Sequence, residues 1–283
     1  MRATPSTVLR IRKSLGQHFL MHPRIAERIV KVAELPFSAT VLEIGPGKGI
    51  LTRELLKRVK KVVAVEVDLQ LCAKLQNTFA AEIKKGQLEL IHDDIRDYPL
   101  SHTTVRIKGY HVVANIPYYL TGEIMRMFLE AKNQPASMTL LVQKEVAERV
   151  ARSNPDAKRS GPRPKRRGKE SVLSLSVKVY GTPKYEFTVP RGAFLPAPNV
   201  DSAVLTIRDI SRKNFKTHAE EKRFFELIHA GFAHKRKFVR NNLATAGFSA
   251  GAIPEKSRAE DLFLSEWLAL TYMCTSHSRA IHR

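Results

Sequence analysis

The sequence predicts an α/β protein, with a Rossmann-like domain built on a parallel sheet and a smaller C-terminal all-helical domain. Apolar runs of strand length alternate with segments of helical periodicity between residues 40 and 150. A glycine-rich turn follows the first of these runs, and after about residue 210 the pattern is wholly helical. Alternating strands and helices imply a parallel sheet that binds ligands at the carboxyl ends of its strands.

Each element follows from its apolar spacing and its terminal residues. A first helix should carry Ile25, Ile29 and Val32 on one face and end at Pro36. The next expected elements are a strand at 40–44, a helix to 58, a strand at 61–66, a helix from Asp68 to Phe79, and strands at 88–91 and 110–114. They are followed by a helix at 121–131, a strand at 137–143, a helix from 144, strand-like alternation at 171–180 and 202–208, and helices at 217–231, 233–246 and 257–272. The last helix has the capping-box pair Ser257 and Glu260.

This pattern divides the chain into two predicted domains. Residues 1–209 form the sheet domain, with a basic arm at 1–13 and a basic loop at 158–169, and residues 210–283 form a helical RNA-binding domain. The loop holds only positive charges, and its proline and glycine residues exclude regular structure, so we expect it to contact phosphates. A nuclear-localisation signal is the alternative for such a run. The arm fits either an RNA-binding segment or a transit peptide.

The charge of the chain points to a polyanionic partner. Its 283 residues include 48 Lys and Arg against 27 Asp and Glu, a net charge of +21. Nucleic acid is the usual partner of such a surface, with a merely solvated basic surface or an anionic membrane as alternatives. The two cysteines, Cys72 and Cys274, have no metal-ligand spacing and suit a reducing compartment. The cysteine spacing leads us to expect no metal site and a cytoplasmic location. No apolar run reaches the roughly 18 residues of a membrane span, so we expect no membrane partner.

The stretch 41–52 reads as a strand, a tight loop and the start of a helix. Its glycines, which can adopt positive φ and let a ligand approach the backbone, are Gly45, Gly47 and Gly49. The spacing does not fit the dinucleotide fingerprint G-x-G-x-x-G. Glu66 ends the next strand, where a carboxylate can accept from ribose hydroxyls. An acid (Glu43) before G-x-G-x-G, with a later strand-end Glu, is the pattern of S-adenosyl-L-methionine (SAM) methyltransferases. An ordinary turn between strand and helix is the alternative.

The segment Asn115-Ile116-Pro117-Tyr118 follows a predicted strand and suits methylation of an adenine amino group. That nitrogen is a poor nucleophile, because its lone pair is delocalised into the ring. Two acceptors, the Asn115 side-chain oxygen and the carbonyl of Ile116 or Pro117, would favour a pyramidal nitrogen with its lone pair aimed at the methyl group. Proline stiffens the loop and so positions these acceptors in advance, and Tyr118 can stack on the extruded base. A simple turn is the alternative, and Tyr119 is expected to pack.

Four segments resemble the ribosomal RNA small-subunit adenine dimethyltransferases: 14–20, 43–49, 115–118 and 194–204. The resemblance spans about residues 12–250. It implies that two adjacent adenosines in a hairpin loop near the 3′ end of small-subunit rRNA each receive two methyl groups. The partner would be this rRNA or the immature small ribosomal subunit, and nothing in the sequence indicates more than a monomer.

The same resemblance implies roles for individual residues. It places SAM contacts at His18, Leu20, Gly45, Glu66, Asp94 and Asn115. Asp94 would bind the adenine amino group of SAM and Glu66 its ribose. Phe194 would flank the target base opposite Tyr118. Many relatives carry Asn where this chain has His18.

Basic residues complete the predicted site. Arg236 and Arg240 are four residues apart in the helix expected at 233–246 and would share a face. We expect this face to contact phosphates, with a solvated helix surface as the alternative. The predicted RNA-binding residues are Lys165, Arg166, Arg167, Lys235, Arg236, Lys237 and Arg240.

Two further functional hypotheses remain open at the level of sequence. One is the related large-subunit rRNA adenine methyltransferase that confers macrolide resistance, which would share the fold and the Asn-x-Pro-Tyr segment. The other is a nucleic-acid-binding relative that has lost catalysis. The helical C-terminal region and the Phe194 segment favour the small-subunit enzyme over the large-subunit methyltransferase. An intact set of Glu66, Asp94 and Asn115 argues against the second.

Overall fold

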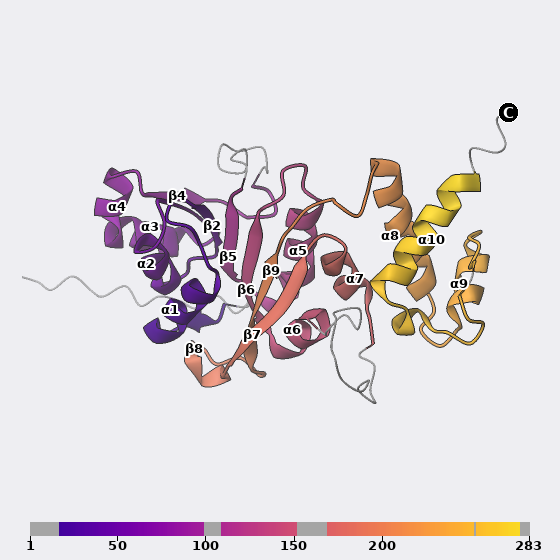
Figure 1. Ribbon diagram of the computed structural model, residues 1–283. Coiled ribbons are helices and arrows are strands. Elements are labelled where there is room, and N and C mark those ends of the chain that lie inside the picture. The colour runs from indigo at the N-terminus through magenta and orange to yellow at the C-terminus, as the bar shows by residue number, and fades with distance from the viewer. Residues whose placement is uncertain (1–16, 99–108, 152–168, 252, 278–283) are drawn as a thin grey trace, which may run out of the picture. The chain divides into compact units, whose positions relative to one another are not determined.

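The computed structural model describes residues 17–98, 109–151, 169–251 and 253–277, with side chains described as far as residue 273 (Figure 1). The predicted basic arm at 1–13 lies outside these residues. Of the basic loop at 158–169, only Lys169 lies within them.

A seven-stranded sheet has the order β4-β3-β2-β5-β6-β9-β7. Its strands are β2 (Thr40–Ile44), β3 (Lys61–Glu66), β4 (Leu88–His92), β5 (His111–Asn115), β6 (Ser137–Gln143), β7 (Thr182–Val189) and β9 (Ser202–Arg208). β2 pairs in parallel with both β3 and β5, while β4 extends the sheet beyond β3 and β6 extends it beyond β5. The chain therefore reverses its direction of progress at β2 and β5. Ligands of such sheets bind at this switch point.

Helices join the parallel strands, as the sequence predicts. They are α1 (Pro23–Val32), α2 (Ile50–Leu56), α3 (Leu69–Thr78), α4 (Ala80–Lys84), η2 (Tyr118–Leu120), α5 (Thr121–Glu130) and α6 (Lys144–Ala151). Consecutive residues Val62, Val63 and Ala64 of β3 are completely buried. A strand buried on both faces reads as a continuous apolar run instead of an alternating one, which is why these strands could be recognised from the sequence.

A short two-stranded pairing holds the N-terminal segment against a later one. β1 (Phe19–Leu20) pairs antiparallel with β8 (Phe194–Leu195), so that Leu20 faces Phe194 in register. Phe19, Leu20 and Phe194 are all buried. The sequence does not predict this strand, because two residues carry no periodicity.

The chain forms two compact units. Unit 1 comprises Met1–Lys144 and Glu186–Thr206, and unit 2 comprises Glu145–Tyr185 and Ile207–Arg283. Segment 145–185 thus groups with the C-terminal helices, whereas the predicted boundary lies at residue 209. Compactness alone does not say which segments fold or bind RNA as a domain, so that boundary stays a prediction.

The strand expected at 171–180 is wrong. Residues Val172–Lys178 form helix α7, and the strand in this region is β7 at Thr182–Val189. The alternation of apolar residues with serine suggests a strand. In the structure, however, the serine side chains form hydrogen bonds with backbone groups of a helix. Ser171 and Ser174 form a capping box, and the Ser176 hydroxyl donates to the carbonyl of Val172.

The helix expected at 233–246 is much shorter. α8 (His218–Phe232) ends before it, and α9 (Val239–Thr245) begins only after an irregular stretch at 233–238. The amide of buried Asn242 donates to the carbonyls of Gly231 and His234 and so caps the end of α8. Arg236 lies in a turn and Arg240 in α9, so the predicted shared helical face is wrong. A charged run without an apolar face cannot hold a helix against the core.

The last helix also differs from its prediction. A 3₁₀ turn, η4 (Ala259–Asp261), precedes α10 (Leu264–His277), and the two are separated by the extended, buried Leu262. The Ser257–Glu260 capping box is therefore wrong. Glu260 pairs with Lys169 instead, and the Glu266 side chain accepts from the Phe263 amide at the start of α10.

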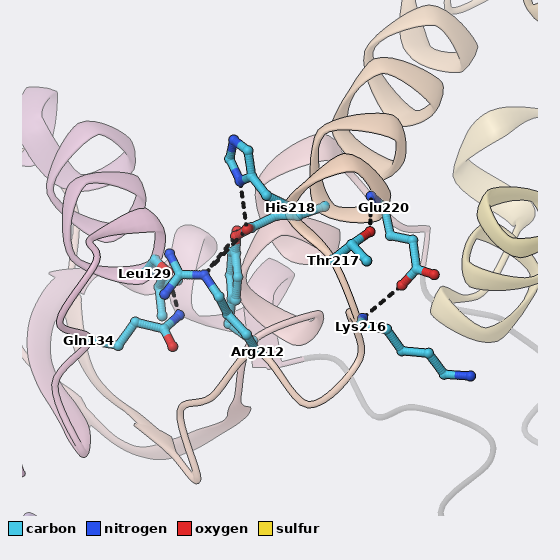
Figure 2. A network of polar contacts seen from close by, with 9 residues as sticks. Leu129, Gln134, Arg212, Lys216, Thr217, His218 and Glu220 are labelled. Atoms are coloured by element: carbon cyan, nitrogen blue, oxygen red, sulfur yellow. Dashed lines mark hydrogen bonds and ion pairs between the residues drawn. The ribbon is translucent and has the colours of Figure 1, made fainter. Parts of the chain in front are cut away.

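Unit 2 holds a helical core in which α8 packs against α9 and α10. The start of α8 is capped reciprocally, since the Thr217 hydroxyl accepts from the Glu220 amide and the Glu220 carboxylate accepts from the Lys216 amide (Figure 2). Trp267 of α10 is completely buried and stacks on Phe232. None of the described helices is long and apolar enough to span a membrane.

Candidate active site

A cavity in unit 1 opens at the switch point of the sheet and collects all the predicted cofactor-binding and catalytic residues except Phe194. Its lining includes His18, Leu20, Gly45, Gly47, Glu66, Asp94, Asn115, Ile116, Pro117 and Tyr118. These residues come from β1 and from the carboxyl ends of four neighbouring parallel strands. The parallel topology explains their convergence, because all four strands end at the same edge.

The loop between β2 and α2 can adopt its path only because three of its residues are glycine. Gly45, Gly47 and Gly49 all adopt positive φ, at 66°, 57° and 77°. A Cβ on Gly47 would lie 3.0 Å from the Phe19 ring, and one on Gly49 would lie 2.6 Å from the Phe79 ring. The loop is therefore packed between buried aromatic rings and can take this path only with glycine.

Glu66 ends β3 with its carboxylate already oriented. One oxygen accepts from the Gly47 amide and the other from the Asp68 amide, both at 3.0 Å. Burial raises the pKa of Glu66, although these two hydrogen bonds act in the opposite direction. Each carboxylate oxygen has a second lone pair. Glu66 can therefore still accept from a pair of ligand hydroxyls.

Glu43 is the least satisfied polar side chain of the cavity. It lines the cavity from β2 with only 1% of its surface exposed. Neither carboxyl oxygen has a hydrogen bond of normal geometry with the described residues, although the hydroxyl and the amide of Thr52 are near enough to oppose the rise of its pKa. Burial raises its pKa to about 8, and the nearby Glu66 adds to this shift. A buried acceptor without a partner is expensive unless a ligand supplies one. The sequence identified Glu43 as part of the motif but gave it no role in binding.

Asp94 lies after β4, where the sequence predicts it, but its carboxylate is already engaged. The Arg96 guanidinium donates to both carboxylate oxygens, with Nη2 2.6 Å from Oδ2. This hydrogen bond lowers the pKa of Asp94. No sequence signal pointed to Arg96, because the pairing depends on a local turn in which the Arg96 amide also donates to Asp94.

Asn115 is fixed by a contact with the N-terminal strand. Its side-chain nitrogen donates to the backbone carbonyl of His18 at 3.0 Å. Since a carbonyl can only accept, this bond settles which way the amide faces. The Asn115 oxygen is then left as an acceptor at the end of β5, in the lining of the cavity.

His18 joins three segments of the site. Its Nδ1 lies 2.8 Å from the carbonyl oxygen of Pro196 and must donate to it, while its own carbonyl accepts from Asn115. Its ring stacks on Tyr118, with centroids 5.8 Å apart. The Tyr118 hydroxyl in turn bonds to Ser202 at 2.7 Å. The sequence predicted His18 only as a SAM contact, and Pro196 and Ser202 could be found only through the resemblance of segment 194–204.

Two aromatic residues differ from their predictions in placement. Phe194 is 4% exposed within the hydrophobic core and does not line the cavity, so the structure does not bring it together with Tyr118. Its role beside a target base stays a prediction. Tyr119, which was expected to pack, is 60% exposed at the cavity rim, and that expectation is wrong.

The predicted RNA-binding residues fall into two groups. Lys165, Arg166 and Arg167 lie outside the described residues. Lys235, Arg236 and Lys237 are exposed on the turn between α8 and α9, whereas Arg240 is half-buried and pairs with Glu255 at 3.4 Å. The turn is closed by the Lys237 amide, which donates to the carbonyl of His234.

The cavity fits a ligand with the chemistry of SAM. Such a ligand carries sulfonium and ammonium cations, and the buried Glu43 lacks a partner while Glu66 and Asp94 add two more carboxyl groups to the lining. A ribose needs acceptors placed as those of Glu66 are. A close approach to the backbone is possible at Gly45 and Gly47. No group of His, Cys, Asp and Glu residues suited to a metal ion occurs among the described residues.

Two solved structures share the fold of this chain. A dimethyladenosine transferase from Plasmodium falciparum superposes with a TM-score of 0.71 at 22% identity, covering 92% of this chain and 98% of that one. The 23S rRNA methyltransferase ErmE gives a TM-score of 0.69 at 24% identity, covering 90% and 98%. Fold and site together define a Rossmann-like methyltransferase.

Sequence relatives identify the family. The family model for ribosomal RNA adenine dimethylases matches residues 8–259. A ribosomal RNA small subunit methyltransferase A of Dehalococcoides mccartyi is 40% identical over 93% of this chain and 88% of its own length. The protein of that name from Fusobacterium nucleatum is 36% identical over 92% and 96%. The chain belongs to the ribosomal RNA adenine dimethylase family, which confirms the predicted resemblance.

Proposed function

We propose that this protein transfers methyl groups from SAM to N6 of two adjacent adenosines in the 3′-terminal hairpin loop of small-subunit rRNA, two to each, during ribosome biogenesis. Family membership supports adenine dimethylation, and the name shared by the sequence relatives supports the small subunit. The observation that carries the proposal is the orientation of Asn115. Its amide nitrogen is occupied by His18, which leaves its oxygen as an acceptor inside the cavity.

Asn115, Ile116 and Pro117 would activate the target amine. The Asn115 oxygen accepts one N–H of the adenine amino group, and the carbonyl of Ile116 or Pro117 accepts the other. The nitrogen then becomes pyramidal and its lone pair is no longer shared with the ring. Pro117 and the His18 contact hold these acceptors in place before the substrate arrives. The proton of the methylated amine passes to solvent, since an N-alkylated adenine cation is acidic enough to lose it without a strong base.

SAM supplies a methyl carbon already activated by its sulfonium. Glu66 would bind the ribose hydroxyls, and Asp94 the adenine amino group. The remaining contacts would come from His18, Leu20, Gly45 and Gly47, which line the cavity. The Asp94 contact requires its carboxylate to accept a further bond beside that from Arg96, or to exchange one for it.

Tyr118 would stack on the extruded adenine. Its hydroxyl is held by Ser202 and its ring rests on His18, so it offers a fixed aromatic surface. A base in a hairpin loop can be splayed out at low cost compared with a base in a duplex. For Phe194 to flank the same base, its buried side chain would have to move when RNA binds.

The basic residues would hold the RNA through its phosphates. These are Lys165, Arg166, Arg167, Lys235, Arg236, Lys237 and Arg240, and the net charge of +21 suits a large polyanion. The partner would be the immature small ribosomal subunit, bound by a cytoplasmic monomer whose residues 210–283 act as an RNA-binding domain.

Primer extension on treated RNA tests this function against both alternatives. Purified protein and SAM are incubated with small and large ribosomal subunits from cells that lack the modification. Stops at two adjacent adenosines of the 3′ small-subunit hairpin support the proposal. A stop only in large-subunit RNA would make the protein a macrolide-resistance type of enzyme, and no stop with bound RNA would make it a non-catalytic binder.

A further inference from the structure

Two consecutive tyrosines at the end of β5 have opposite environments. Tyr118 is held by Ser202 and His18. Tyr119, the next residue of η2, is 60% exposed, and its side chain makes no hydrogen bond or ring stacking with the described residues. Both residues line the same cavity. Tyr119 therefore presents a large aromatic ring to solvent at the entrance of the site.

Packing within unit 1 does not account for this exposure. The ring is not part of the hydrophobic core of the sheet. The lining of the same cavity also includes the exposed Arg96. An exposed aromatic ring in the lining of a cavity that also contains an arginine suits nucleobase stacking, because every base presents a π-face.

We propose that Tyr119 stacks on the nucleotide next to the target adenosine and so holds the second adenosine of the pair at the rim while the first is in the cavity. This inference depends on the proposed function, because it takes the ligand to be single-stranded loop RNA. Tyr118 and Tyr119 are adjacent in sequence, as are the two adenosines in the RNA. One tyrosine lies within the cavity and the other at its edge, so each can serve one base of the pair.

The role assigned to Tyr119 is substrate binding and not chemistry. It does not touch the reacting atoms, so its loss should raise KM for RNA and leave kcat nearly unchanged. Asp94, Arg96 and Tyr119 all line the cavity, and Asp94 is one of the carboxylates that would hold SAM. The affinity for SAM must therefore be measured separately.

The test is a double-mutant cycle between protein and RNA. The probe is a synthetic hairpin with two adjacent loop adenosines, and a second hairpin has an abasic nucleotide in place of one of them. Tyr119→Ala should weaken binding of the intact hairpin by about 5- to 150-fold, the range expected for one base–aromatic stack. Tyr119→Phe should bind as the wild type does. On the abasic hairpin Tyr119→Ala should cost little, because the stacking partner is already gone.

Phe37 offers a matched control. It is 76% exposed and precedes the amino end of β2, at the opposite edge of the sheet. Phe37→Ala removes an exposed aromatic ring of similar size and should leave RNA binding unchanged. Calorimetry with SAM alone should give the same affinity for Tyr119→Ala as for the wild type.

Three results would overturn the inference. They are an unchanged affinity of Tyr119→Ala for the intact hairpin, an equal loss on both hairpins, and a loss of SAM affinity as large as the loss of RNA affinity. The last would mean that the ring covers the cofactor. The cycle needs no methyl transfer, so it stays distinct from primer extension, whose failure in the wild type would defeat the proposed function alone.

Discussion

Two buried glutamates, one in each compact unit, differ in their hydrogen-bond partners and in the direction in which their pKa is shifted. Glu43 in unit 1 lies at the cavity without a hydrogen bond of normal geometry to the described residues, and burial raises its pKa to about 8 despite the nearby Thr52. Glu221 in unit 2 accepts from the Tyr180 hydroxyl, from Arg212 and from His218. Figure 2 shows Arg212 and His218 directed at the same carboxylate. Burial by itself raises the pKa of Glu221, but these partners outweigh it and the pKa lies below its usual value.

The difference separates a carboxylate whose charge is matched within the chain from a buried carboxyl group that is left open to a ligand. Glu221 stabilises α8 and its surroundings because its charge is matched from within the chain. Glu43 and the Asn115 oxygen are left without partners in a cavity that fits a cationic, nucleoside-bearing ligand. Unit 1 gives up stability at its site, as functional sites commonly do, whereas the network in unit 2 satisfies its buried charge.

The largest effect is expected at Asn115. Replacing Asn115 with Ala removes the open acceptor and should lower kcat by about 10²–10³-fold, the usual cost of one pre-positioned hydrogen bond to a developing charge. Affinity for SAM should fall much less. Single-turnover kinetics and calorimetry give the two quantities, and parallel losses in both would show that Asn115 only shapes the SAM site.

Glu43→Gln should make the stability of the protein less dependent on pH. The folded pKa of Glu43 is raised from 4.5 to about 8, so between these values the unfolded chain has lost a proton that the folded protein keeps. Stability from this group is complete below pH 4.5 and is lost as the pH rises to about 8. Chemical denaturation across this pH range should therefore show a steeper decline for the wild type than for Glu43→Gln. Identical slopes would mean that Glu43 is ionised in the folded protein.

For Glu221, the dependence of stability on pH should have the opposite sign to that for Glu43. The folded pKa of Glu221 is depressed, so its contribution to stability is present at neutral pH and is lost as the pH falls through the folded pKa. Removing the charge leaves Arg212 and the Tyr180 hydroxyl with a weaker partner and should cost about 1–3 kcal/mol at neutral pH. Denaturation at neutral and at acidic pH measures this, and the gap to the wild type should narrow at the lower pH. A constant gap would exclude the charge as its cause.

The smallest effect is expected for exposed cations that contact RNA phosphates. The variant K235Q/R236Q/K237Q removes three exposed cations from the turn before α9, and the slope of log affinity for RNA against log salt should fall by about 2. The matched control K213Q/K216Q/K256Q removes three exposed cations of unit 2 outside this turn and should retain the slope. Equal slopes for the two variants would show that the turn makes no specific phosphate contacts.

Much of unit 1 could be predicted from the sequence. Buried parallel strands read as apolar runs, and the residues that follow these runs include Glu66, Asp94 and Asn115, all of which line the cavity. Unit 2 was predicted less well, since the segment expected as a strand at 171–180 contains a helix and only the second half of the helix expected at 233–246 is helical. In those segments, serine hydroxyls and the Asn242 amide satisfy the backbone in ways that apolar periodicity does not register.

The class of sheet, the glycine loop and the set of residues at the strand ends could be predicted from the sequence, because each depends on local propensity or on the period of the apolar pattern. Which of these residues are already hydrogen-bonded or buried, and which are open to a ligand, depends on contacts made in the folded chain. Asp94 is paired with Arg96, Phe194 is buried and Tyr119 is exposed, whereas Asn115 is turned by a carbonyl 97 residues away in the chain. Such contacts join distant segments, and no local pattern in the sequence encodes them.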